Sequence, residues 1–73
     1  MKKEFWVVIV TYEDGTVNVS QEIYKKYENA KAFIYSRSDE IKEVLVLGVV
    51  GKVNYYDTKN KIKYEIKGVE LGD

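Results

Sequence analysis

The sequence predicts an α+β fold in two layers, with one helix packed on one face of an antiparallel sheet of about four strands. Three observations lead to this prediction. They are an Asp-Gly dipeptide between two strand-like runs, a central stretch with apolar residues at helical spacing, and a final third in which apolar and polar residues alternate. The length of 73 residues allows one domain, which we place at 1–73.

The first third of the chain is expected to form a β-hairpin. Residues 5–12 are dense in β-branched and aromatic side chains and end just before Asp14-Gly15. This dipeptide favours a tight turn, because glycine accepts a positive φ without a steric penalty. Residues 16–20 then alternate strictly between polar and apolar, which is typical of a strand with one solvent-exposed face.

The start of the helix has two interpretations. In one, Ser20 caps a helix that begins near Gln21. In the other, which we favour, the second strand runs on to Tyr24 and the helix begins near Tyr27, because the residues after Tyr27 suit a helix interior better. Both interpretations end the helix around 36–39 and give the same buried stripe: Tyr27, Ala30, Phe33 and Ile34.

The remaining chain predicts two more strands. Residues 43–56 form one long apolar run, in which we interpret Gly48 and Gly51 as a bulge or a bend. Residues 57–60 supply turn chemistry.

The last strand follows this turn. In it Ile62, Tyr64 and Ile66 alternate with charged residues, which is typical of a one-sided antiparallel strand, and Gly68 is expected to shift this phase. The predicted order is therefore β-β-α-β-β.

Two of these strands are apolar at both odd and even positions, around residues 5–10 and 44–50. A strand buried on one face should alternate, so both strands are expected to be covered on both faces. One helix covers a single face. The other is hidden either by closure of the sheet into a small barrel or, as we favour, by a second copy of the chain. The contact residues expected in this homodimer, formed through a sheet face or edge, are Trp6, Val8, Val10, Val44 and Val46.

The composition argues against catalysis. The chain contains no His and no Cys, which excludes imidazole acid–base chemistry, thiolate nucleophiles, disulfides and zinc sites built from these ligands. The acidic pairs at 13–14 and 39–40 fall where loops are expected, and Gly48 and Gly51 lack the pattern of a phosphate-binding loop. We therefore expect no enzymatic activity, no cofactor and no bound metal.

Binding of single-stranded nucleic acid is the alternative function. Residues 44–69 hold five Lys against one Asp and one Glu, and tyrosines lie among these lysines, a combination typical of single-strand binders. The residues concerned are Lys52, Tyr55, Tyr56, Lys59, Lys61, Lys63 and Lys67. However, the formal net charge of the chain is zero, and lysines on an edge strand also protect it from aggregation. Nucleic acid therefore ranks below protein as a partner.

The sequence predicts a cytoplasmic location and no membrane association. No apolar run approaches the roughly eighteen residues that a membrane-spanning helix requires. Met1-Lys2-Lys3 gives a positive start, but the apolar run at 5–10 is short and lacks a small-residue cleavage site, so we expect no signal peptide.

Several segments together resemble small β-β-α-β-β proteins encoded by phages and prophages. The resemblance covers roughly residues 4–56 and rests on Phe5-Trp6-Val7-Val8, Tyr12-Glu13-Asp14-Gly15-Thr16, Tyr27-Glu28-Asn29-Ala30-Lys31-Ala32-Phe33-Ile34 and the Val/Leu strand that follows. It implies an accessory protein of a mobile element that binds and modulates a host protein, and it assigns no catalytic residue. The predicted function is thus a non-enzymatic protein–protein interaction module.

Overall fold

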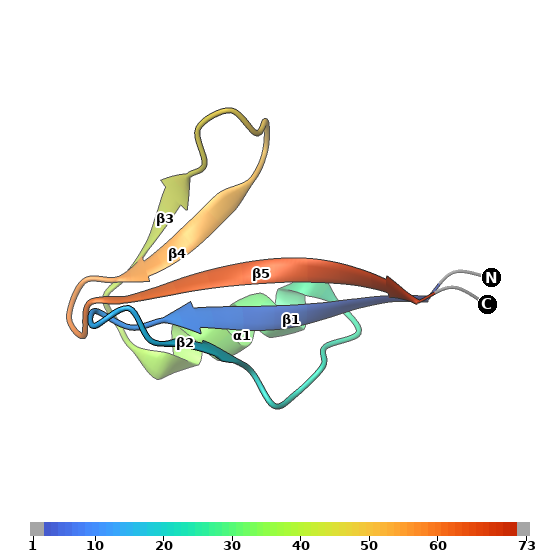
Figure 1. Cartoon of the computed structure of the whole chain (residues 1–73), viewed down its shortest axis with the longest axis horizontal. Coiled ribbons are helices and arrows are strands. Elements are labelled where there is room, and N and C mark those ends of the chain that lie inside the picture. The colour runs from blue at the N-terminus through green and yellow to red at the C-terminus, as the bar shows by residue number, and fades with distance from the viewer. Residues whose placement is uncertain (1–2, 72–73) are drawn as a thin grey trace.

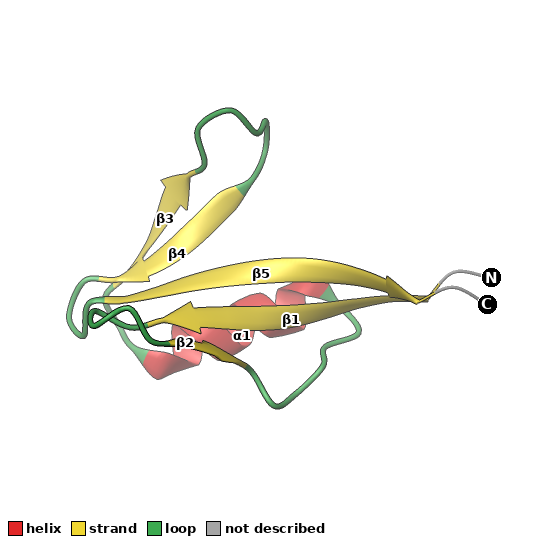
Figure 2. Cartoon of the chain, viewed as in Figure 1, coloured by secondary structure: helices red, strands yellow, loops and turns green. Residues whose placement is uncertain are grey.

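The fold is a two-layer α+β structure built on a five-stranded antiparallel sheet (Figures 1 and 2). The computed structural model describes residues 3–71, so Met1, Lys2, Gly72 and Asp73 of the predicted domain lie outside the described residues. The elements are β1 (Lys3–Thr11), β2 (Val17–Val19), α1 (Tyr27–Arg37), β3 (Ile41–Leu45), β4 (Val53–Asp57) and β5 (Ile62–Leu71). The strand order in the sheet is β2-β1-β5-β4-β3. The predicted fold class is confirmed.

The chain between β2 and α1 shows why the favoured helix start is correct. Ser20 stays with β1, where its Oγ accepts a hydrogen bond from the backbone N–H of Val8 (3.1 Å), so it does not cap a helix. The second strand does not run on to Tyr24 as predicted, because it ends at Val19 and the chain bulges away from β1. The chain returns only at Tyr24, whose backbone exchanges two hydrogen bonds with Trp6 (2.7 and 2.8 Å). Only after this last sheet contact does the helix begin, at Tyr27.

The core lies between α1 and one face of the sheet. Its buried members come from β1, α1, β4 and β5: Val8, Val10, Ala30, Ile34, Tyr55, Tyr64 and Ile66. Tyr27 and Phe33 complete the predicted helical stripe as half-buried residues packed against this core. The hydroxyls of Tyr27 and Tyr55 share a 2.7 Å hydrogen bond; burial, together with this bond, raises the pKa of Tyr55.

The stretch predicted as one long strand is two strands joined by a loop. Gly48 and Gly51 do not bend a continuous strand; with φ of 86° and 77° they occupy turns that reverse the chain. Residues on either side pair as β3 and β4, from Ile41 opposite Asp57 to Leu45 opposite Val53. This correction adds a fifth strand, and the order is β-β-α-β-β-β.

β5 lies in the centre of the sheet, between β1 and β4. Lys63 is paired with β1 and with β4, so it does not protect an edge, and the outermost strands of the sheet are β2 and β3. Gly68 does not shift the phase of the strand, because the β1–β5 register runs without interruption from Thr11 opposite Lys63 to Lys3 opposite Leu71. An open sheet with two edges also rules out the barrel alternative.

The turn between β4 and β5 carries a local strain that a substitution can relieve. Lys61 has a φ of 58°, in the left-handed region that disfavours residues with a Cβ. We expect Lys61→Gly to raise the free energy of unfolding by about 0.5–1 kcal/mol in urea denaturation. The control is Lys59→Gly in the same turn, which has no positive φ to relieve and is expected to lose stability; an equal effect of both substitutions would contradict this account.

Candidate protein interaction surface

The most exposed apolar segment of the chain is the loop between β3 and β4, together with the end of β3. We call residues 44–51 the hairpin arm; they project away from the two layers (Figure 1). Two consecutive turns build its tip. Val49 N donates to Val46 O (3.4 Å), and Lys52 N donates to Val49 O (3.5 Å). The third position of each turn is a glycine with positive φ, as a type II turn requires.

This geometry places Leu47 and Val50 at the second position of the two turns. The exposed fraction of the residue is 94% for Leu47 and 104% for Val50. Turn formation requires no apolar side chain at this position, where proline is the favoured residue. Packing within the chain does not require one either, so these two side chains are candidates for contact with another molecule. The arm also exposes Val44, Leu45 and Val49, and residues 44–51 contain no charge.

The sheet face opposite α1 is a second apolar surface. Cross-strand pairs place Phe5 beside Val69 and Ile9 beside Val19 on this face, and Val17 is opposite Thr11. Val17, Val19 and Val69 are exposed, and no layer covers this face within residues 3–71. The sequence has more apolar residues in these segments than one helix can cover. In the structure the uncovered apolar residues lie partly on this face and partly in the hairpin arm.

The structure divides the five residues predicted to contact a partner. Val8 and Val10 are buried under α1, so their assignment to an interface is wrong. Trp6 lies on the same covered face, where its ring packs edge-on against Tyr27 with centroids 5.4 Å apart. Val44 is exposed and Val46 is half-buried, and both belong to the hairpin arm. The two residues from the later strand thus stay candidates, and Phe5 replaces Trp6 on the free face.

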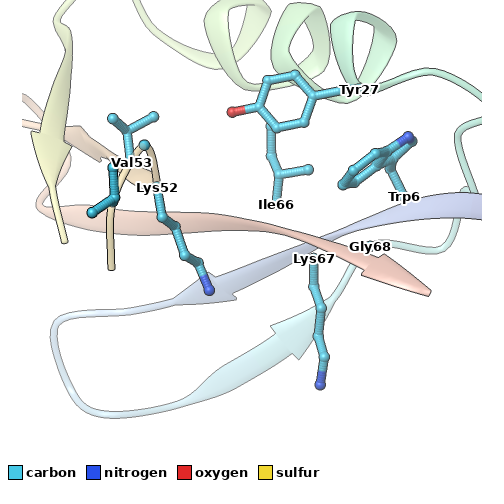
Figure 3. Close-up of a pocket in the computed structure, with 9 residues that line it drawn as sticks. Trp6, Tyr27, Lys52, Val53, Ile66, Lys67 and Gly68 are labelled. Carbon is cyan, nitrogen blue, oxygen red and sulfur yellow. The ribbon is translucent and has the colours of Figure 1, made fainter. Parts of the chain in front are cut away.

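The predicted nucleic-acid residues do not form one patch. Tyr55 is buried in the core and cannot stack on a base. Lys59 and Lys61 lie in the turn between β4 and β5. Tyr56 is opposite Lys42 on one side and Lys63 on the other, and this row lies on the face opposite α1. The remaining two residues, Lys52 and Lys67, point to that same side (Figure 3).

A cavity of about 430 Å³ lies where β4 separates from β5. We call it the notch. Its lining residues are Trp6, Tyr27, Val50, Gly51, Lys52, Val53, Ile66, Lys67 and Gly68. Sequence patterns did not indicate it, since it depends on how far two strands stay paired.

Gly68 gives the Trp6 ring its place in the notch. Trp6 and Gly68 are opposite each other on β1 and β5, and a Cβ at Gly68 would lie 2.8 Å from the ring. We expect Gly68→Ala to displace the ring and lower the free energy of unfolding by about 1 kcal/mol, with a change in tryptophan emission. Val69→Ala, on the other face of the sheet, is the control. If Gly68→Ala had the same stability and the same tryptophan emission as the parent chain, this placement of the Trp6 ring would be contradicted.

The acidic residues considered for catalysis lie in exposed turns and loops. Asp14 is exposed and accepts a 2.9 Å hydrogen bond from Thr16 N, which lowers its pKa, and Asp39 and Glu40 are exposed. Within residues 3–71 no group of three acidic side chains is placed to hold a metal ion. The helix described here is too short and too polar to cross a membrane.

Comparison with models of protein families, with curated proteins and with solved structures finds no match for this chain.

Proposed function

We propose that this chain is a non-enzymatic protein–protein interaction module of the cytoplasm that forms a homodimer through the hairpin arm. The observation that best supports this proposal is the exposure of Leu47 and Val50 at turn positions that need no apolar side chain. In keeping with the resemblance to phage and prophage proteins, the module serves as an accessory protein that binds a host protein.

A second copy is a suitable partner for the arm on grounds of charge. The formal net charge of the chain is zero and the arm is uncharged, so two copies approach without repulsion. The outer edge of β3 also has no neighbouring strand among the described residues. Antiparallel pairing of two β3 edges centred on Glu43 would set two carboxylates opposite each other. Centring on Val44 instead pairs two valines and lays the start of each arm beside β3 of the other copy.

Sedimentation equilibrium tests this proposal. Between about 1 µM and about 300 µM, the average mass is expected to rise from the monomer value of 8.5 kDa towards twice that value, as for a small transient interface. A monomer throughout this range would refute the homodimer.

One observation favours nucleic acid as a second candidate. Tyr56 lies between Lys42 and Lys63 on the uncovered sheet face, so a stacking ring is flanked by two cations. On this proposal, fluorescence polarisation with labelled single-stranded oligonucleotides would show binding at low salt that weakens steeply as salt rises. Absence of binding at low salt would exclude it.

A further inference from the structure

The notch is a gap in the sheet and not only a surface depression. β5 pairs with β1 from Lys63 to Leu71, but with β4 only from Ile62 to Tyr64. Beyond this point β4 leans away from β5 (Figure 1). From Glu65 to Val69, the side of β5 that faces β4 therefore has no strand beside it in the described part of the chain. Such an edge offers backbone groups to an incoming strand.

The two sides of the notch differ in chemistry. Figure 3 shows the rings of Trp6 and Tyr27 and the side chain of Ile66 on the α1 side of β5. Gly68 adds no side chain there, so the Trp6 ring lies directly over the strand. The opposite side carries Lys52 and Lys67, which point away from α1 (Figure 3).

The two lysines differ in their ion pairing within the described residues. The amine of Lys52 lies 3.8 Å from a carboxylate oxygen of Glu65, and the amine of Lys67 has no ion-pair partner among residues 3–71. A strand inserted beside β5 would point alternate side chains to the two sides of the sheet. One set would meet the apolar side and the other set would meet the lysines.

We infer that the notch is a strand-addition site for an extended peptide in which apolar and acidic residues alternate. The apolar residues pack on Trp6 and Ile66, the acidic residues pair with Lys52 and Lys67, and the peptide backbone bonds to the free side of β5. The strand also brings N–H donors to the start of β4, where Oδ1 of Asn54 is buried with no hydrogen-bond partner within the described residues.

This inference rests on the proposed protein-binding function. Of the two turn corners of the hairpin arm, Val50 also lines the notch, whereas Leu47 does not. The arm of a second copy is the competing occupant. It is a poorer fit, because residues 44–51 carry no acidic group for the lysines.

Tryptophan fluorescence tests the site directly, since Trp6 is the single tryptophan of the chain. The probe is a synthetic eight-residue peptide of alternating valine and glutamate, titrated into the full chain. We expect a saturable emission change with a Kd of about 10–100 µM, typical of a small interface. Two control peptides, one with lysine in place of glutamate and one N-methylated at alternate amides, are expected to bind at least about tenfold more weakly.

Reversing the charge of single lysines tests which of them contact the acidic peptide. We expect Lys67→Glu to weaken binding of the acidic peptide by about fivefold to tenfold and to favour the lysine peptide, while Lys59→Glu, the same change in the β4–β5 turn, leaves both affinities unchanged. Leu47→Asp, in the arm, should also leave peptide binding unchanged. Absence of a saturable signal, or equal binding of the N-methylated peptide, would overturn the site while leaving self-association through the arm standing.

Discussion

Replacing Asp57 with alanine is expected to lower the free energy of unfolding by about 3 kcal/mol, a large share of the stability of a domain this small. Asp57 is fully buried at the end of β4. Its Oδ1 accepts hydrogen bonds from the backbone N–H groups of Lys59 (2.9 Å) and Asn60 (3.0 Å), and its Oδ2 accepts one from Asn60 Nδ2 (2.8 Å). The substitution removes the acceptor and leaves these donors without it.

The same carboxylate predicts how stability depends on pH. Burial alone would raise the pKa of Asp57, but the hydrogen bonds from Asn60, Ser38 and Lys59 outweigh it and hold the pKa below its usual 3.8. A lowered pKa in the folded state means that the stabilisation is present above the unfolded value and is lost as pH falls through the folded value. Stability of the parent should therefore decline below about pH 4, and Asp57→Asn should flatten this decline.

Urea denaturation at neutral and acidic pH checks both expectations for Asp57. The control is Asp39→Asn, an exposed carboxylate, which is expected to change the free energy of unfolding by less than about 0.5 kcal/mol. If Asp57→Ala were as stable as this control, the buried carboxylate would not anchor the β4–β5 turn.

The double substitution Leu47→Asp, Val50→Asp is expected to weaken self-association by about a hundredfold. A hundredfold change equals about 2.7 kcal/mol. A symmetric dimer contains four of these side chains, so each contributes about 0.7 kcal/mol. This is less than the roughly 1.5–3 kcal/mol of full burial, because a small interface buries each side chain only in part. Folding should be unaffected, because both side chains are exposed and lie outside the core.

Sedimentation equilibrium measures this effect, and urea denaturation verifies that the variant is folded. Ile23→Asp is the matched control, since Ile23 is also an exposed apolar residue (64%) but lies outside the arm. Dimerisation that survives the arm substitutions, or that is lost equally with Ile23→Asp, would place the contact elsewhere.

Much of the fold could be predicted because its signals are local. Asp14-Gly15 marks the first turn, the spacing of Ala30 and Ile34 marks the helix, and Asp57 marks the last turn, where its side chain bonds to the turn backbone. The loop between β3 and β4 escaped prediction because valine and leucine fill its turns. The signal that could have predicted these two consecutive turns is the pair of glycines three residues apart, Gly48 and Gly51.

The surfaces were harder to predict because they depend on contacts between distant segments. β1 is apolar on both faces, so its periodicity cannot say whether Phe5 or Trp6 faces the helix. In the structure, the residues of β5 opposite Phe5 and Trp6 determine which of the two faces the helix. Gly68 is opposite Trp6 and leaves room for its ring, whereas Val69 is opposite Phe5. The notch likewise follows from the short pairing of β4 with β5, which no single stretch of sequence encodes.

The central claim is that the hairpin arm is where two copies of this chain meet. A dilution series followed by amide nitrogen–proton NMR correlation spectra measures this residue by residue. We expect the amide signals of residues 44–51 and of β3 to shift with protein concentration, while those of α1 and of the β4–β5 turn stay constant. Signals that stay constant throughout, or that shift only outside the arm and β3, would contradict the claim.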